Sequence, residues 1–181
     1  MSADLAVQIS ELKQKVEDLE PGKQNKLAMV VFSGDLDKLL AAMIIATGAA
    51  AMGMKVVQFF TFWGTAALRN PDIKAEGKNF MSKMFGWMLP NGRNKVKLSK
   101  MNMGGMGTSM MKSLMKKKNV ASLEEMIKMA AELEVKIFVC EMSMDLMGFK
   151  HEEMIDYPGM EYVGVATFLE HAIRSRITLF L

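Results

Sequence analysis

The sequence contains one cysteine, Cys140, and this residue has the clearest potential for covalent chemistry. It ends the run 135–140, which is typical of a strand buried on both faces, and a short helix is predicted near 143–148. In an open parallel sheet, ligands bind at the carboxyl ends of the strands. The start of the following helix would favour the thiolate form of the cysteine. Such a thiolate can accept a sulfane sulfur, hold it as a persulfide and pass it on.

A purely structural role for Cys140 stays open. Buried cysteines are common because they pack as small hydrophobic residues. Glu141 and Asp145 follow closely in the sequence, and nearby carboxylates oppose the formation of a thiolate. The residues themselves therefore leave two interpretations, a reactive thiol and a packing residue.

The two histidines, His151 and His171, form no recognisable motif with Cys140. A nucleophile of the cysteine-protease type needs a histidine base within hydrogen-bond reach. We expect His171, on a predicted amphipathic helix, to pack or to face solvent, and His151 to lie at a solvated helix start. A zinc site made of these distant residues has little support, and we expect neither a metal nor a cofactor.

Two glycine-containing segments are candidates for phosphate binding. Ser33, Gly34 and Asp35 follow the first predicted strand, but Asp35 and Asp37 disfavour an anion at that helix start. The segment 104–108 can form a nest of backbone amides, yet no strand precedes it, so a flexible loop is favoured.

Methionine is unusually frequent, with 21 in 181 residues. Nine of them lie between positions 81 and 115, in a segment (70–119) that interrupts the α/β pattern and ends at Lys116, Lys117 and Lys118. Methionine side chains repack easily against partners. We therefore interpret 80–118 as a mobile lid or docking surface near Cys140, with the lysines steering an acidic partner. Core and dimer contacts, or Cu(I) binding through thioethers, are the alternatives.

Strand-like and helix-like segments alternate along the rest of the chain. The predicted strands are 27–32, 55–62, 135–140, 161–163 and 177–181, and the predicted helices are 36–52, 122–133, 143–148, 151–155 and 164–174. Ser122 and Glu125 have the spacing of a capping box. Strands that alternate with helices indicate a parallel sheet covered on both faces.

Residues 1–22 precede this pattern as a separate predicted helix. Its apolar residues recur at alternating spacings of four and three, as in a coiled-coil seam. They are Leu5, Ile9, Leu12, Val16 and Leu19. A helix this short is marginal in isolation. We favour packing against another subunit, and packing on its own domain is the alternative.

The composition excludes several classes of protein. Half of the residues are hydrophobic and 24% are charged, which excludes a disordered chain. A net charge of +3 does not indicate a nucleic-acid-binding protein. Residues 39–54 carry no charge, but a helix of that length spans about 24 Å, less than the hydrocarbon core of a membrane. The lone thiol and the N-terminus without a secretion signal indicate a cytoplasmic protein.

Several separate runs resemble the DsrE/DsrF-like sulfur-relay family, and more closely its longer DsrE-like subgroup with a Met-rich insertion. The resemblance covers about 27–181. The runs are FSGDLDKLLAAMIIATGAAAMGMKVVQFFTFWG at 32–64, MFGWMLP at 84–90, KLSKMNMGGMGTSMMKSLMKKKNVASLEE at 97–125, CEMSMDLMG at 140–148 and GVATFLEHA at 164–172.

This resemblance implies a flavodoxin-like three-layer α/β sandwich over 26–181, with a five-stranded, mostly parallel sheet in strand order 2-1-3-4-5. It implies homo-oligomers, and sulfane sulfur carried on the cysteine that matches Cys140. Partners would be TusA-like carriers and rhodanese-like proteins. Since the chain has no second cysteine, sulfur would have to arrive from and leave to another molecule.

The residues expected to line the sulfur site follow the predicted strands. They are Ser33, Gly34, Asp35, Trp63, Gly64, Met142, Ser143, Met144 and Gly164. Two other functions remain alternatives to a sulfur carrier: a non-enzymatic oligomeric interaction protein with a Met-rich docking surface, and a flavin- or nucleotide-binding protein.

Overall fold

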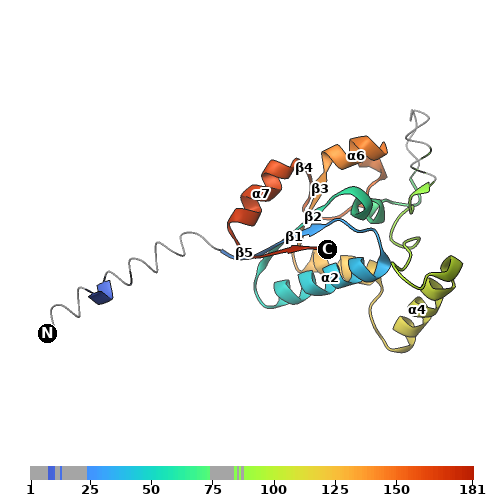
Figure 1. The fold of residues 1–181 in the computed structure, drawn as a ribbon, viewed down its shortest axis with the longest axis horizontal. Coiled ribbons are helices and arrows are strands. Elements are labelled where there is room, and N and C mark those ends of the chain that lie inside the picture. The colour runs from blue at the N-terminus through green and yellow to red at the C-terminus, as the bar shows by residue number, and fades with distance from the viewer. Residues whose placement is uncertain (1–7, 11–12, 14–23, 74–83, 85, 87) are drawn as a thin grey trace.

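A five-stranded sheet with only parallel pairings forms the centre of the computed structural model, which describes residues 8–10, 13, 24–73, 84, 86 and 88–181 (Figure 1). The strands are β1 (Gln24–Val31), β2 (Lys55–Phe60), β3 (Lys136–Cys140), β4 (Met160–Val163) and β5 (Ser175–Phe180). The predicted parallel α/β fold is therefore confirmed.

The strand order is β4-β3-β2-β1-β5, so the predicted order 2-1-3-4-5 is wrong. The predicted order places β2 at an edge of the sheet. In the structure β2 lies between β1 and β3, and its residues 56–60 are all buried. A strand buried on both faces is suited to an interior position. β5 takes an edge instead, and most of its residues are exposed.

Helices cover both faces of the sheet and make the expected three layers (Figure 1). Successive residues of a strand point to opposite faces. Leu27, Met29 and Val31 of β1 belong to the core cluster that includes residues of α2 (Leu36–Ala51) and α5 (Leu123–Glu132). Ala28 of β1 belongs to the smaller cluster on the opposite face, which α7 (Val165–Ile173) covers through Phe168.

Local sequence signals set the ends of these helices. Ser122 caps α5: its Oγ accepts from the Glu125 backbone N–H at 3.3 Å, and the Glu125 carboxylate accepts from the Ser122 backbone N–H at 2.7 Å. The predicted capping box is thus confirmed. α6 (Glu141–Met147) begins directly after β3, two residues earlier than predicted.

Shorter helices complete the described chain. η1 (Phe62–Leu68) follows β2, η3 (His151–Glu153) lies between α6 and β4, and η2 (Met103–Gly105) leads into α4 (Met106–Lys117). The described part of the predicted Met-rich insertion therefore contains a helix of three turns. Among the described residues, no helix has the length and apolar character needed to cross a membrane.

The predicted N-terminal seam mostly lies outside the described residues. Ile9 is described and is exposed. Leu5, Leu12, Val16 and Leu19 are not among the described residues. The coiled-coil interface stays a prediction.

Candidate functional site

Cys140 is the last residue of β3, at the carboxyl edge of the sheet, and α6 begins at the next residue. Its side chain shares a face with Phe138 and lies in the smaller core cluster with Val57, Phe59 and Phe168. Only 4% of the residue is exposed. A sulfur atom bound to Cys140 would therefore lie in apolar surroundings between the sheet and α7.

The loops after β1 and β2 pack tightly against each other beside this position. A Cβ atom on Gly34 would collide with the carbonyl oxygen of Trp63, and one on Gly64 would collide with the carbonyl oxygen of Val31. Backbone atoms have little freedom to move away, so both positions require glycine. The two predicted glycines thus have a structural role in bringing neighbouring strand ends together.

Charges in the first loop are neutralised locally. The buried Ser33 hydroxyl donates to the Asp35 carboxylate at 2.9 Å, and Asp35 forms an ion pair with Lys38 at 3.0 Å. The Asp37 carboxylate accepts from the backbone N–H of Ser99 at 2.8 Å and from its hydroxyl at 2.6 Å. Burial alone would raise the pKa of Asp37, but these hydrogen bonds together outweigh it and lower the pKa below its usual value. Both carboxylates after β1, those of Asp35 and Asp37, therefore have local hydrogen-bond or ion-pair partners.

α6 is held against the end of β2 by a buried hydrogen bond between the Thr61 and Ser143 hydroxyls at 2.8 Å. Ser143 and Met144 face the interior, whereas Met142 and Leu146 are 58% and 62% exposed. Trp63, in the adjacent η1, is 45% exposed. Apolar side chains at the surface thus accompany the helix that follows Cys140. Thr61 was not predicted as a site residue, because it lies inside the predicted strand 55–62 and a lone threonine there carries no sequence signal.

The structure brings the predicted lining residues to one edge of the sheet. Ser33, Gly34 and Asp35 follow β1; Trp63 and Gly64 follow β2; Met142, Ser143 and Met144 follow β3. Gly164 follows β4 and precedes α7, next to Val163, which is the register partner of Cys140. All four loops therefore lie at the edge of the sheet where β3 ends with Cys140, although Met144 belongs to the main core.

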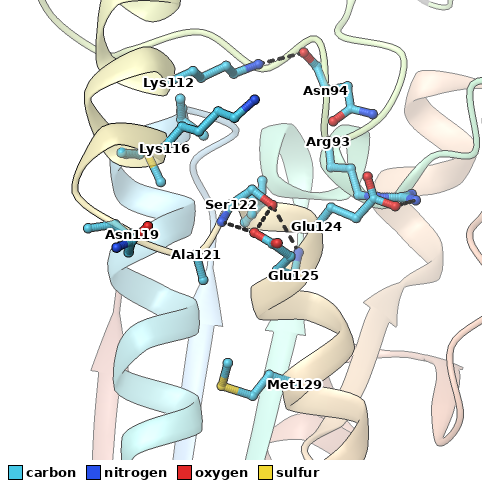
Figure 2. Close-up of a pocket in the computed structure, with 14 residues that line it drawn as sticks. Arg93, Asn94, Lys112, Lys116, Asn119, Ala121, Ser122, Glu124, Glu125 and Met129 are labelled. Carbon is cyan, nitrogen blue, oxygen red and sulfur yellow. Dashed lines mark hydrogen bonds and ion pairs between the residues drawn. The ribbon is translucent and has the colours of Figure 1, made fainter.

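The predicted docking lysines lie on the other side of the sheet from the Cys140 side chain. Lys116 and Lys117 are in the last turn of α4, and Lys118 follows it. Lys116 lines a cavity of about 690 Å³ between α4 and the start of α5, in which Lys112 Nζ donates to the Asn94 carbonyl at 2.8 Å (Figure 2). In the same cavity Arg93 forms an ion pair with Glu124 at 2.9 Å.

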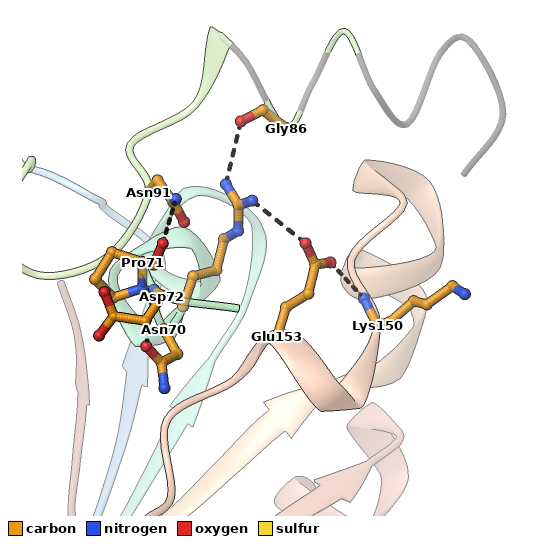
Figure 3. Close-up of polar contacts among 8 residues, drawn as sticks. Asn70, Pro71, Asp72, Gly86, Asn91, Lys150 and Glu153 are labelled. Carbon is orange, nitrogen blue, oxygen red and sulfur yellow. Dashed lines mark hydrogen bonds and ion pairs between the residues drawn. The ribbon is translucent and has the colours of Figure 1, made fainter. Parts of the chain in front are cut away.

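A buried ion pair at the carboxyl side of the sheet was missed by the sequence analysis. The Arg69 guanidinium, which follows η1, lies 3.5 Å from the Glu153 carboxylate in η3 (Figure 3). It also donates to the Gly86 carbonyl at 3.4 Å and lies over the Phe149 ring, 4.6 Å from its centroid. Glu153 accepts from the Lys150 backbone N–H at 2.9 Å. The partners are far apart in sequence, so no local pattern indicates them.

The two histidines are engaged elsewhere. The exposed His151 ring stacks on Tyr162, with ring centroids 3.8 Å apart. His171 packs edge-on against Phe138, and its Nδ1 contacts Lys26 Nζ at the amino edge of the sheet. Both imidazole rings therefore contact residues other than Cys140.

Comparisons with known proteins agree with this geometry. The model of the DsrE/DsrF/DrsH-like family matches residues 23–180. The chain is 47% identical over 156 residues to the uncharacterized protein YrkE of Bacillus subtilis, covering 86% of this chain and 96% of that protein. It is 39% identical over 166 residues to the sulfur carrier protein DsrE2 of Allochromatium vinosum, covering 88% of this chain and 99% of that protein.

The fold has a solved counterpart. The crystal structure of the YchN protein of Escherichia coli is similar, with a TM-score of 0.50 at 11% sequence identity, over 86% of this chain and 98% of that one. At this identity the likeness concerns the fold. The family match spans nearly the whole α/β unit, and two relatives exceed a third of identical residues over most of their length. The chain therefore belongs to the DsrE/DsrF/DrsH-like family.

Proposed function

We propose that this protein is a sulfur carrier that holds sulfane sulfur as a persulfide on Cys140 and exchanges it with partner proteins. The observation that carries this proposal is the position of the chain's one cysteine, at the carboxyl end of β3, in a chain similar to a protein named as a sulfur carrier. The carboxyl edge is where open α/β sheets bind their ligands.

The transfer step is a thiol–persulfide exchange. The Cys140 thiolate attacks the outer sulfur of a donor persulfide R–S–SH. An S–S bond forms at Cys140, the S–S bond of the donor breaks, and its electron pair leaves with the donor thiolate. One thiolate is consumed and one is released, so the exchange needs no external oxidant or reductant. An acceptor thiol takes the sulfur away by the same step.

The surroundings of Cys140 suit a carrier. The apolar cluster shields a bound sulfane sulfur from water and from small thiols in solution. Because the thiol is almost fully buried, the donor must engage the carboxyl edge closely. The exposed side chains of Trp63, Met142 and Leu146 offer an apolar surface for that engagement. TusA-like or rhodanese-like proteins are the proposed partners, and thiol exchange of this kind fits the reducing cytoplasm.

Mass spectrometry tests the proposal directly. The full chain is incubated with a persulfide-loaded rhodanese-like donor, and intact mass is measured before and after addition of a TusA-like acceptor. We expect a gain of one sulfur atom, its loss to the acceptor, and no gain in the Cys140→Ser variant. A chain that stays unmodified while the same donor loads the acceptor directly would refute the carrier function.

A second surface supports the interaction role that the sequence suggested. α4 exposes Met106, Met110 and Leu114, which recur every four residues along the helix, and its positive residues Lys116 and Lys117 lie in the last turn. We propose that α4 docks an acidic partner.

For the N-terminal segment we propose self-association: deletion of 1–22 should lower the oligomeric mass in light scattering and leave the α/β domain folded, and an unchanged mass would contradict this.

A further inference from the structure

Basic side chains from four elements line a cavity of about 840 Å³ at the amino edge of the sheet, far along β3 from Cys140. Lys26 comes from β1, Lys55 from β2, Lys136 from β3, and His171 from α7. The amino ends of three adjacent strands and the last turn of the covering helix thus supply one cationic cluster.

The register of the sheet puts these lysines on one face. Lys26 is the register partner of Lys55, and Lys136 is the partner of Val57. Side chains at partner positions of parallel strands lie on the same face of the sheet. Residues two positions apart in one strand also share a face, so Lys26 lies on the face of Ala28 and Lys136 on the face of Phe138. Ala28, Val57 and Phe138 all belong to the cluster covered by α7. The lysines therefore lie on the α7 side, where His171 is.

Positive charge in this cluster exceeds its negative charge. Lys136 forms an ion pair with Glu161 at 3.2 Å, and the nearby Arg174 pairs with Glu170 at 3.4 Å. Within the described part of the chain, Lys26 and Lys55 have no carboxylate partner in ion-pair range, and Glu134 is the one acidic residue in the cavity lining. Lys26 and Lys55 are thus left without an ion-pair partner, and Glu134 is the carboxylate of the lining that offsets part of their charge.

Lys26 is the group most affected by this excess. It is only 7% exposed, and its ammonium contacts Nδ1 of His171. Burial makes the largest contribution to lowering the pKa of Lys26. The positive charges of Lys136, Arg174 and Lys55 lower it further, and the negative charge of Glu170 opposes them. A lysine ammonium has donors only, so Nδ1 of His171 accepts the hydrogen bond and Nε2 carries the ring proton. The cluster therefore offers ammonium and imidazole donors together.

We propose that this amino-edge cavity binds a doubly charged tetrahedral oxyanion of the phosphate or sulfate class. The oxyanion supplies acceptors for the Lys26, Lys55 and Lys136 ammonium groups and the counter-charge that the protein lacks there. Lysines serve this purpose as mobile point charges. The cavity also extends round the amino edge to apolar residues on the other side of the sheet, Met54, Val56 and Leu133, so the oxyanion is either free or the phosphoryl group of a small organic molecule. The site is separate from Cys140 and does not depend on sulfur transfer.

The two imidazoles of the chain allow a direct test by NMR. The full chain is titrated with inorganic phosphate at constant ionic strength, maintained with chloride, while the ring signals of His171 and His151 are followed. We expect a saturable shift of His171 and little change of the exposed His151. Phenyl phosphate in a parallel titration distinguishes the sources: clearly tighter binding indicates an organic phosphate, and equal affinity indicates the free oxyanion.

Charge-matched variants locate the site. Lys55→Gln and Lys136→Gln should each weaken phosphate binding roughly tenfold, since each removes one charged hydrogen-bond donor. Lys128→Gln, on the outer surface of α5, removes the same charge elsewhere and should bind as the wild type does. Phosphate should also raise the melting temperature of the wild type more than that of Lys55→Gln.

Three results would overturn the proposal. One is a His171 signal that does not saturate with phosphate. Another is equal affinity in wild type, Lys55→Gln and Lys136→Gln. The third is a His171 shift that follows protein concentration rather than phosphate, because the cavity would then hold an acidic side chain from a second copy of the chain.

Discussion

The two edges of the sheet handle charge in opposite ways. At the carboxyl edge, Arg69 and Glu153 form a buried pair, Asp35 is paired with Lys38, and the thiol of Cys140 lies among apolar side chains. At the amino edge, Lys26 and Lys55 line a cavity without a paired carboxylate in the described part of the chain. One edge is thus closed and internally neutralised, and the other is open and cationic. The first arrangement suits a protected covalent adduct, and the second suits a charged ligand held by electrostatics.

The largest effect is expected from breaking the buried pair at the carboxyl edge. Glu153→Ala leaves the Arg69 guanidinium buried without its carboxylate, which typically costs about 3–5 kcal/mol of unfolding free energy. The matched control at the amino edge is Glu161→Ala, because the Lys136–Glu161 pair is half exposed and should contribute less than about 1 kcal/mol. Urea denaturation measures both. Equal losses in the two variants would contradict the contrast between the edges.

A smaller loss is expected from disturbing the contact between the loops after β1 and β2. Gly34→Ala places a methyl group against the Trp63 carbonyl, and overpacking of this kind costs about 1–3 kcal/mol. Gly164→Ala is the control at the same edge, since a Cβ there meets open space, and only a loss of about 1 kcal/mol or less at the helix start is expected. If Gly34→Ala is as stable as the wild type, the two loops are not held in this arrangement.

The sequence allowed the local features of this fold to be predicted and left the long-range ones open. The Ser122–Glu125 capping box and the helix after Cys140 depend on residues a few positions apart, and both are present. The predicted strand order was wrong, because the residues of a strand indicate whether it is buried but not which strands lie beside it. The Arg69–Glu153 pair and the amino-edge lysines depend on tertiary contacts and register, which no local spacing encodes.

The sequence also left the accessibility of Cys140 undetermined. A cysteine at the end of a buried strand can face either side of the sheet, and α7 covers the side that this one faces. The covering helix comes from the far end of the chain, so its position follows from the strand order rather than from the residues around Cys140. Burial makes donor docking a requirement of the proposed transfer.

An effect of about tenfold on rate is expected from the surface lysines of α4. Replacing Lys116, Lys117 and Lys118 by Glu should slow sulfur transfer from a protein donor roughly tenfold at low ionic strength and less at high salt, because steering is screened. Loading of Cys140 by a small polysulfide should change little. The control replaces the exposed Lys95, Lys100 and Lys128 by Glu. The docking role of α4 would be contradicted if both triple variants slowed transfer from the protein donor equally. It would also be contradicted if the α4 variant slowed loading by the protein donor and by the polysulfide equally.

The smallest effect is expected from pH at the amino edge. Burial, Lys26 and Lys136 lower the pKa of His171 below its usual value of 6.5, against weaker opposing effects of Glu170 and Glu161. The unfolded chain therefore binds more protons than the folded one in the pH range just below 6.5. The unfolding free energy should fall as the pH drops from 6.5 through the lower folded pKa, and should not change further from this group above 6.5.

Protonation also removes the acceptor that Nδ1 of His171 presents to the Lys26 ammonium. His171→Gln, which keeps an acceptor but cannot gain charge, should flatten the decline in stability below pH 6.5, whereas His151→Gln at the carboxyl side should not. Phosphate should offset the decline in the wild type, because an anion in the cavity compensates the added charge. Urea denaturation across this pH range, with and without phosphate, measures the effect. A wild-type decline that matches that of His171→Gln would mean that protonation of His171 does not cause the loss of stability.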